Sequence, residues 1–191
     1  PYLTLYAFST ENWQRPAHEV EALMQLLMET LDKETPTLIK NGIRLATIGH
    51  PEALPGRVQR ALEASKAATQ SGEHMTLTLA LSYGSRQDIA LAARKLAQQV
   101  AQGHLRPEDI TPERMARALA TAPLPDPELL IRTSGEQRLS NFLLWELAYT
   151  ELYITDTLWP DFRRPHLHQA LQDFQRRERR FGRISEQLTQ P

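Results

Sequence analysis

Short apolar runs rich in β-branched and aromatic residues alternate along this chain with longer segments of helical periodicity. Such runs predict strands at residues 2–8, 43–48, 75–81, 129–131 and 152–154. Strands that alternate with helices of ten or more residues are typical of a parallel sheet covered by helices. We therefore expect an α/β fold with a mainly parallel central sheet.

The first long helix illustrates the helical pattern. Pro16 suits the first turn of a helix, and the apolar residues from Val20 to Leu31 follow i, i+3, i+4 spacing as one stripe. Pro36 is expected to kink or break this helix, because proline lacks a backbone N–H. The pair Asn41-Gly42 is expected to end it. Other helices are expected up to residue 68, over 88–100, after Thr111 and over 166–188.

Length and composition bound the function. The 191 residues suffice for one sizeable core, so we expect a single domain over residues 1–191. A net charge of -1 lacks the basic surplus of nucleic-acid binders, so no nucleic-acid partner is expected. The absence of cysteine excludes disulfide and thiolate chemistry. No apolar run approaches the roughly 20 residues that span a bilayer.

A polar cluster at residues 9–16 directly follows the first predicted strand. Ser9 and Thr10 supply hydroxyl donors, and Arg15 supplies a fixed charge suited to phosphate. A strand-to-helix turn with free N–H groups also binds anions. The alternative is an ordinary capped turn, because the same residue types are common helix caps, with Trp13 as plain core.

A second cluster, residues 131–142, follows the predicted strand at 129–131. Arg132 and Arg138 can each bind phosphate oxygens in bidentate fashion, and Ser140 with the backbone near Gly135 could complete a cradle. The alternative is a surface loop in which Glu136 pairs with one of the two arginines, an interaction that is common and weak.

A third candidate is Glu151, since a carboxylate beside a diphosphate site can hold Mg²⁺ through oxygen. A surface charge is the alternative reading of a single glutamate. Asp156 and Asp161 are equally available acids, and spacing alone does not choose among the three.

In order and spacing, these segments resemble the cis-prenyltransferases of the undecaprenyl diphosphate synthase type. The resemblance runs from residue 2 to about 182 and lies in residues 3–16, 83–89, 131–142, 151–162 and 176–182. It implies an enzyme that adds isopentenyl diphosphate units in cis geometry to an allylic diphosphate such as farnesyl diphosphate. The product would be a polyprenyl diphosphate, a lipid carrier for bacterial cell-wall sugars.

The resemblance also implies residue roles. Asn12 matches the polar residue assigned to proton removal from the isopentenyl unit, aided by Ser9 as a second catalytic residue, and Glu151 matches the ligand of the expected cofactor, Mg²⁺. The implied substrate-binding residues are Ser9, Thr10, Glu11, Trp13, Arg15, Arg132, Arg138, Leu139, Ser140, Arg180 and Gly182. The apolar stripe on the first helix and Leu77, Leu79 and Leu81 are candidates for tunnel walls, with solid core as the alternative.

The same resemblance implies partners and a location. We expect a homodimer in which residues 180–182 of one subunit reach the active site of the other. We expect a cytoplasmic protein that contacts the inner face of the membrane transiently, when the hydrocarbon product is released. His166 and His168 are read as a solvated helix start rather than a metal pair, because no third ligand is near in the sequence.

Three departures from the family pattern are visible. The family carries a catalytic aspartate in an Asp-Gly-Asn-Gly-Arg-Trp turn that would precede residue 1, so we expect that segment to be missing and this chain alone to lack turnover. Gln137 stands where relatives often have His, which puts a metal or proton role at this position in doubt. Ser85, Ser134 and Leu81 replace smaller residues, and Leu81 could shorten the product.

Two rival functions remain at this stage. One is a non-catalytic partner subunit of a cis-prenyltransferase complex, although such subunits tend to lose the substrate clamp that is present here. The other is an unrelated phosphate-binding α/β module. Nucleotide-binding glycine motifs are absent, so the sequence gives no support for ATP or NAD.

Overall fold

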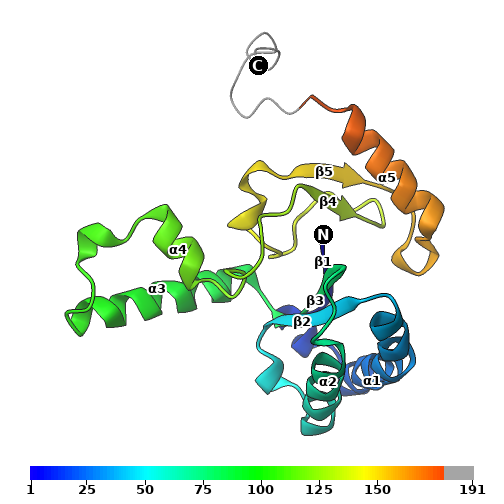
Figure 1. Cartoon of the computed structure of the whole chain (residues 1–191), viewed down its shortest axis with the longest axis horizontal. Coiled ribbons are helices and arrows are strands. Elements are labelled where there is room, and N and C mark those ends of the chain that lie inside the picture. The colour runs from blue at the N-terminus through cyan, green and yellow to red at the C-terminus, as the bar shows by residue number, and fades with distance from the viewer. Residues whose placement is uncertain (179–191) are drawn as a thin grey trace. The chain divides into compact units, whose positions relative to one another are not determined.

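The computed structural model describes residues 1–178. The chain divides into two compact units, Pro1–Pro125 and Asp126–Pro191. Each unit is described by itself, with element labels as in Figure 1. The single domain expected over residues 1–191 stays a prediction.

The first unit contains a three-stranded parallel sheet. Its strands β1 (Tyr2–Ser9), β2 (Ile43–Gly49) and β3 (Met75–Tyr83) lie in the order β1-β3-β2. The central strand β3 is buried from Thr78 to its end, including the polar residues Thr78 and Ser82, as expected of a strand covered on both faces. The predicted strands and their parallel arrangement are confirmed.

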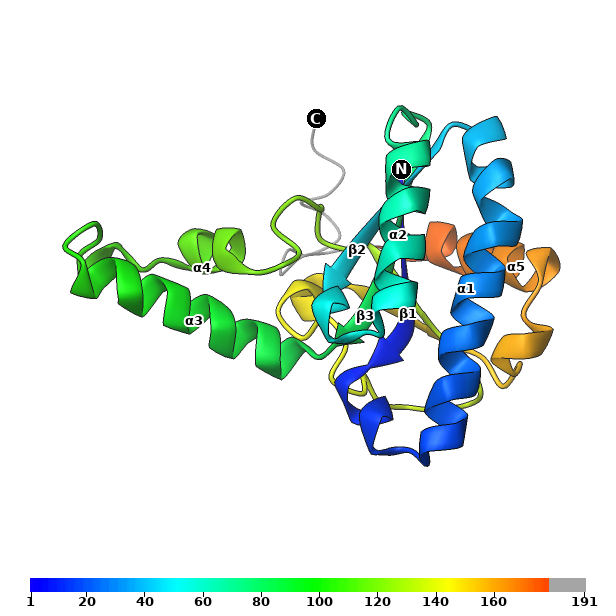
Figure 2. The same ribbon diagram turned by 90° about the horizontal axis from the view of Figure 1, so that it is seen from below.

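Two helices cover this sheet. Helices α1 (Ala17–Lys40) and α2 (Gly56–Thr69) pack side by side against it (Figure 2). Burial of each large apolar side chain stabilises the fold by about 1.5–3 kcal/mol. The buried core consists of Phe8, Met24, Leu31, Leu45, Leu54, Val58, Leu62, Leu79 and Leu81.

Helix α1 continues through Pro36 to Lys40, so the predicted break is wrong. Proline removes the hydrogen bond to the carbonyl of Asp32, but Asp32 and Pro36 both lie on the exposed side of the helix, where water can replace the lost donor. The neighbouring Thr35 hydroxyl donates to the Leu31 carbonyl at 2.6 Å. The helix ends before Asn41, as predicted.

The remaining helices of this unit are α3 (Ser85–Ala101) and α4 (Pro112–Ala118), which pack against each other. Thr111 caps α4 as predicted, because its hydroxyl accepts from the Arg114 N–H at 3.3 Å. In the first turn of α3, the buried carboxylate of Asp88 accepts from the Ala120 N–H at 3.1 and 3.2 Å. This carboxylate ties the segment after α4 to the start of α3.

The second unit is smaller. Its strands β4 (Leu129–Arg132) and β5 (Glu151–Ile154) form a parallel pair, and α5 (Arg164–Arg176) packs against β5. The prediction that the last helix reaches residue 188 is wrong. Arg177 adopts an extended conformation with ψ 136° and ends the helix, and its guanidinium binds the carboxylates of Glu151 and Asp173.

Short 3-10 helices complete the described chain: η1 (Thr10–Gln14), η2 (Pro51–Ala53), η3 (Pro107–Asp109), η4 (Glu146–Tyr149) and η5 (Trp159–Asp161). Within residues 1–178, no helix combines the length and hydrophobicity that crossing a bilayer requires.

Candidate active site

The carboxyl ends of β1 and β3 do not pair regularly. Tyr6 pairs with Ala80, Phe8 with Leu81, and Ser9 with Tyr83. One residue of β1, Ala7, and one of β3, Ser82, therefore stand outside the pairing. Ser82 has a left-handed backbone with φ 47°, and such bulges are frequent beside active sites.

Immediately after this irregular pairing, Ser9 and Asn12 meet. The Ser9 N–H donates to Asn12 Oδ1 at 2.8 Å. Only the amide oxygen can face an N–H group, so this contact fixes the orientation of the Asn12 amide. Its NH₂ group remains as the donor that can bind a ligand. The structure thus brings together the two residues predicted to be catalytic.

Trp13 is held from two sides. Its indole Nε1–H donates to Ser82 Oγ at 2.9 Å, and its ring packs edge-on against Phe8, with ring centroids 4.9 Å apart. The residue nevertheless remains 37% exposed. The sequence analysis missed Ser82, because a serine at a strand end carries no signal for a bulge.

The other predicted residues of this turn lie on its surface. The Thr10 hydroxyl donates to Glu11 Oε2 at 3.2 Å, and Arg15 lies 3.8 Å from Glu19 one helical turn away. Such exposed contacts are weak, so they would yield readily to a phosphate.

The loop after β4 is conformationally strained. Left-handed φ values occur at non-glycine residues Ser134, Ser140, Asn141 and Leu143. Each such residue costs about 1–3 kcal/mol, and such residues cluster at ligand-binding sites. Four such residues between Ser134 and Leu143 mark the loop as a candidate site.

Two of the predicted clamp residues meet in this loop. Arg132 Nη2 lies 3.4 Å from Ser140 Oγ, a long contact. Arg132 Nε is buried and has no hydrogen-bond partner among residues 1–178, so the guanidinium retains donor capacity. Arg138 instead pairs with Glu136, which is the surface pairing considered as the alternative.

Two backbone amides near Gly135, where the cradle is predicted, already have partners. The Ser134 N–H donates to the Thr157 carbonyl, and the Gly135 N–H donates to the Thr155 carbonyl, both at 2.9 Å. These amides extend the β4–β5 pairing beyond the strands. They are therefore not available to bind phosphate.

Glu151, the predicted Mg²⁺ ligand, opens β5. Its Oε2 accepts from Arg177 at 2.8 Å, and Arg177 also binds Asp173. The pKa of Arg177 is raised, chiefly by the hydrogen bond to Glu151. The second oxygen of Glu151 has no partner within the described chain.

The donor chemistry at Glu151 fits Mg²⁺ in part. Mg²⁺ is commonly bound through one or two carboxylates together with substrate phosphates, and Glu151 supplies one carboxylate. Residues 1–178 contain no group of three acidic or histidine side chains arranged for a metal.

For three of the predicted substrate-binding residues, Leu139, Arg180 and Gly182, the structure gives few or no contacts. Leu139 is half-buried, and its carbonyl accepts from the Phe142 N–H at 3.2 Å, so it shapes the loop. Arg180 and Gly182 lie outside the described residues.

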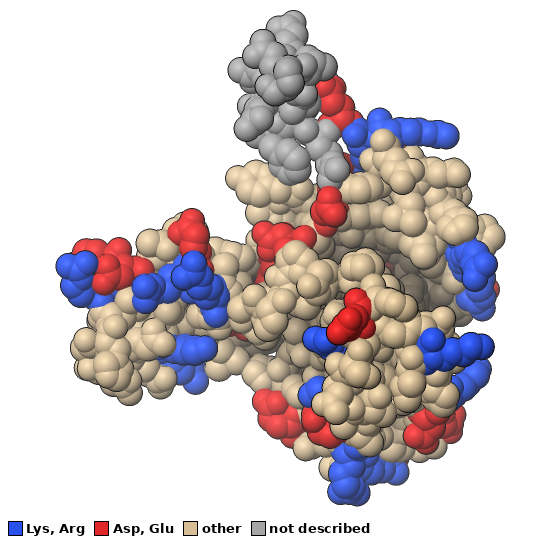
Figure 3. Space-filling view, in the orientation of Figure 1, with Lys and Arg blue, Asp and Glu red and all other residues tan. Residues whose placement is uncertain are grey.

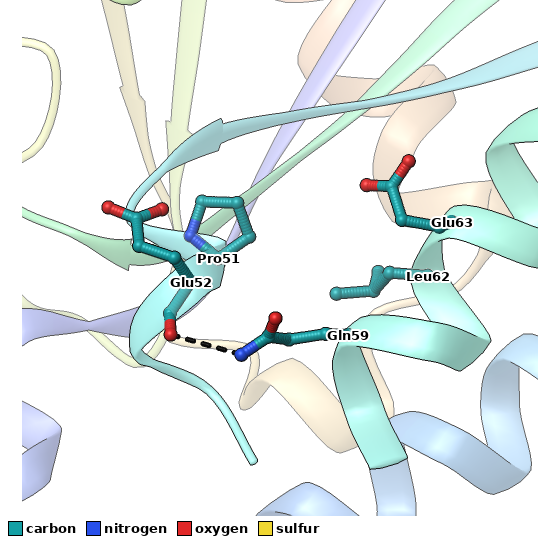
Figure 4. A pocket seen from close by; sticks show the side chains of 5 residues that line it. All are labelled: Pro51, Glu52, Gln59, Leu62 and Glu63. Carbon is teal, nitrogen blue, oxygen red and sulfur yellow. Dashed lines mark hydrogen bonds between the residues drawn. The ribbon is translucent and has the colours of Figure 1, made fainter. Parts of the chain in front are cut away.

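The predicted tunnel residues of β3 lie in or against the hydrophobic core of the first unit. Leu81 is fully buried in the core. An open hollow of about 190 Å³ in the first unit is lined by Pro51, Glu52, Gln59, Leu62 and Glu63, and Gln59 donates to the Glu52 carbonyl across it (Figure 4). The positions of Leu77, Leu79 and Leu81 agree with the core alternative, and a tunnel role stays a prediction.

Basic and acidic side chains are interspersed over the face shown in Figure 3. No broad field of one sign covers that face, consistent with the small net charge of -1.

Comparison with known proteins decides the family. The family model described as "Putative undecaprenyl diphosphate synthase" matches residues 1–182. The chain belongs to this family. Undecaprenyl diphosphate synthases are prenyltransferases of the α/β class, so the predicted family, fold class and enzyme class are confirmed.

Relatives in the family are similar over almost the whole chain. An isoprenyl transferase of Chlorobaculum tepidum is 52% identical over 97% of this chain and 70% of its own length. A farnesyl-diphosphate-specific ditrans,polycis-undecaprenyl-diphosphate synthase of Pseudomonas syringae is 50% identical over 97% of this chain and 74% of its own length.

Solved structures agree. A lavandulyl diphosphate synthase from Lavandula x intermedia, in complex with dimethylallyl diphosphate, has a TM-score of 0.90 at 40% identity and covers 95% of this chain and 78% of its own. A probable undecaprenyl diphosphate synthase from Campylobacter jejuni has a TM-score of 0.84 at 34% identity, over 95% of this chain and 83% of its own.

Proposed function

We propose that this chain condenses isopentenyl diphosphate in cis geometry onto an allylic diphosphate such as farnesyl diphosphate. The observation that carries the proposal is the family match over residues 1–182. The polar clusters that follow β1 and β4 support it, because α/β enzymes bind ligands at the carboxyl ends of their strands.

The reaction breaks the C1–O bond of the allylic diphosphate, and the electron pair leaves with the diphosphate. The double bond of the isopentenyl unit forms the new C–C bond to C1, and C2 of that unit then loses a proton. An amide such as Asn12 is too weak a base to keep this proton. We infer that the proton passes to a diphosphate oxygen or to water.

The role of Asn12 follows from its orientation. Its oxygen accepts from the Ser9 N–H, so its NH₂ group is the part that faces a substrate. We infer that Asn12 donates to a diphosphate oxygen and holds that oxygen near the proton. Orientation of this kind lowers the entropic part of the barrier.

Arg132, Arg138 and Ser140 are proposed to bind the diphosphate of the isopentenyl substrate. Arg138 must first leave Glu136. That exchange costs little, because an exposed ion pair contributes about 0–1 kcal/mol, whereas guanidinium–phosphate hydrogen bonds are strong and bidentate.

Glu151 is proposed to hold Mg²⁺ together with substrate oxygens. When bound, the ion supplies positive charge that stabilises the departing diphosphate. Arg177 occupies one carboxylate oxygen of Glu151 and leaves the other for this purpose.

A homodimer is proposed on the basis of the exposed apolar side chains of the second unit. Large apolar side chains that stay exposed are candidates for an interface, and a contiguous patch of them marks an interaction site. The exposed side chains are Tyr149, Leu152, Ile154, Leu158, Trp159, Leu167 and Leu171. Residues 1–191 are proposed to act as one domain in the cytoplasm, with transient membrane contact as the hydrocarbon product leaves.

Incorporation of radiolabelled isopentenyl diphosphate by the full-length protein, with farnesyl diphosphate as starter, tests the proposal. We expect label in a long polyprenyl product and a rate about 10- to 100-fold lower for Arg132→Ala, which removes charge-assisted hydrogen bonds. Arg117→Ala on α4 is the matched control. No incorporation with any allylic starter would refute the enzyme and leave the partner subunit or another phosphate-binding module.

A further inference from the structure

Ser82 is an unusual residue for the end of a central strand. It is only 3% exposed, and its φ of 47° places a non-glycine residue in the left-handed region. The residues on either side keep their partners in β1, Phe8 for Leu81 and Ser9 for Tyr83. Ser82 is therefore the extra residue of a bulge and is held there by pairing on both sides.

The bulge changes where the serine side chain lies. Side chains alternate between the two faces of a regular strand, and an extra residue interrupts that alternation. The result is that Ser82 Oγ accepts from Trp13 Nε1–H at 2.9 Å. The contact joins η1, which follows β1, to the end of β3.

Trp13 has few other restraints. The indole Nε1–H is the polar group of this side chain and can only donate a hydrogen bond. The contact of the ring with Phe8 is edge-on. With 37% of the residue exposed, packing alone leaves the ring room to rotate. The hydrogen bond to Ser82 is the directional contact that selects one orientation.

We propose that Ser82 is a positioning residue, which fixes the Trp13 indole for binding the allylic diphosphate. This inference rests on the proposed function and on the substrate-binding role that the family resemblance implies for Trp13. Left-handed backbone persists where the surroundings over-determine it, and it is concentrated at ligand sites. A serine is suited to this position because it supplies a compact acceptor.

Ser82→Gly is the informative variant. Glycine adopts φ 47° without strain, so the bulge and the fold should be kept while the acceptor is lost. Ser82→Asn is the conservative variant, since asparagine tolerates the left-handed region and offers an amide oxygen. Thr78→Val is the control on the same strand, because the buried Thr78 hydroxyl has no partner within residues 1–178.

The measurement uses the full-length protein with every tryptophan except Trp13 replaced by phenylalanine. Anisotropy and acrylamide quenching report the mobility of the Trp13 ring, and a titration with farnesyl diphosphate reports its affinity. In Ser82→Gly we expect a more mobile, more quenchable ring. We also expect about three- to tenfold weaker farnesyl diphosphate binding, the loss from one neutral hydrogen bond. Ser82→Asn should restore part of the ring restraint and part of the farnesyl diphosphate affinity. Thr78→Val should equal the parent in both measurements.

The outcomes separate the two hypotheses. A parent protein that incorporates no labelled isopentenyl diphosphate would overturn the proposed function. A parent that incorporates label, but whose Trp13 emission does not respond to farnesyl diphosphate, would overturn the positioning role. A parent that responds, with a Ser82→Gly variant of equal affinity or unchanged ring mobility, would overturn the positioning role while leaving the proposed function in place.

Discussion

Backbone strain occurs in both units, but its surroundings differ. In the first unit, the left-handed Ser82 lies between the buried residues Leu81 and Tyr83, inside a paired sheet. In the second unit, four left-handed non-glycine residues lie in one loop after β4, and β4 itself is only half-buried along its whole length.

The difference indicates two ways to hold a site. Packing fixes the first, because a close-packed core resists displacement. Hydrogen bonds of the loop backbone hold the second, as when Ser134 and Gly135 donate to the segment after β5. Regions with few buried apolar contacts open at lower cost, so we expect the β4 loop to adapt to its ligand and the β1–β3 end to be preformed.

Gly49→Ala should test the rigid region with the largest effect. Gly49 ends β2 with φ 102°, and a Cβ there would lie 2.3 Å from the Leu81 carbonyl oxygen. Backbone atoms of a central strand cannot move aside cheaply. We expect a loss of about 3–5 kcal/mol in the free energy of unfolding, measured by urea denaturation. A loss under about 1 kcal/mol would show that this end of the sheet is adaptable after all.

Leu81→Ala should lower the free energy of unfolding somewhat less than Gly49→Ala. The side chain is fully buried in the core, so its removal leaves a cavity and should cost about 2–4 kcal/mol. Leu26→Ala on α1 is the matched control, because Leu26 is 58% exposed. Product lengths of the parent and variant enzymes, compared by chromatography, test the separate idea that Leu81 narrows a tunnel; unchanged lengths would leave only the core role.

Gly135→Ala is the counterpart in the second unit. Gly135 also has a left-handed φ, 65°, but the atom nearest to an added Cβ is Asp156 Oδ1 at 2.8 Å. A side-chain carboxylate on the surface can turn away, so only the backbone cost of about 1–2 kcal/mol should remain. Denaturation measured beside Gly49→Ala checks this, and equal losses would remove the contrast between the two units.

The sequence predicted the strands, their parallel arrangement and the polar turns with few errors, because periodicity and strand-to-helix order depend on local residues. It could not predict the bulge at Ser82 or the hydrogen bond of the Gly135 amide to Thr155. Both depend on the register between strands that are far apart in the sequence. The continuation of α1 past Pro36 was missed for a related reason: exposure of the Asp32 carbonyl is a tertiary property.

The smallest effect concerns Asp88, which joins α3 to the segment after α4. Burial raises the pKa of the Asp88 carboxyl above its ordinary value of 3.8, although the Ala120 N–H and His50 oppose the shift. The folded chain thus binds this proton more tightly than the unfolded chain. By linkage, the contribution of Asp88 to stability falls as pH rises through the window above 3.8 and stays low at neutral pH.

Asp88→Asn should remove this pH dependence, because the amide keeps an oxygen for the Ala120 N–H and carries no charge. We expect a change of less than about 1 kcal/mol at pH 7, in the stabilising direction, since a buried charge is removed. Asp109→Asn is the opposite control, because hydrogen bonding to Arg106 lowers the pKa of Asp109, so the parent loses that contribution as pH falls. Urea midpoints of both variants between pH 4 and pH 7 decide the question. If the urea midpoints of the two variants changed with pH along parallel slopes, the Asp88 carboxyl would be hydrated in solution. The junction between α3 and α4 would then be less tightly packed than the sheet.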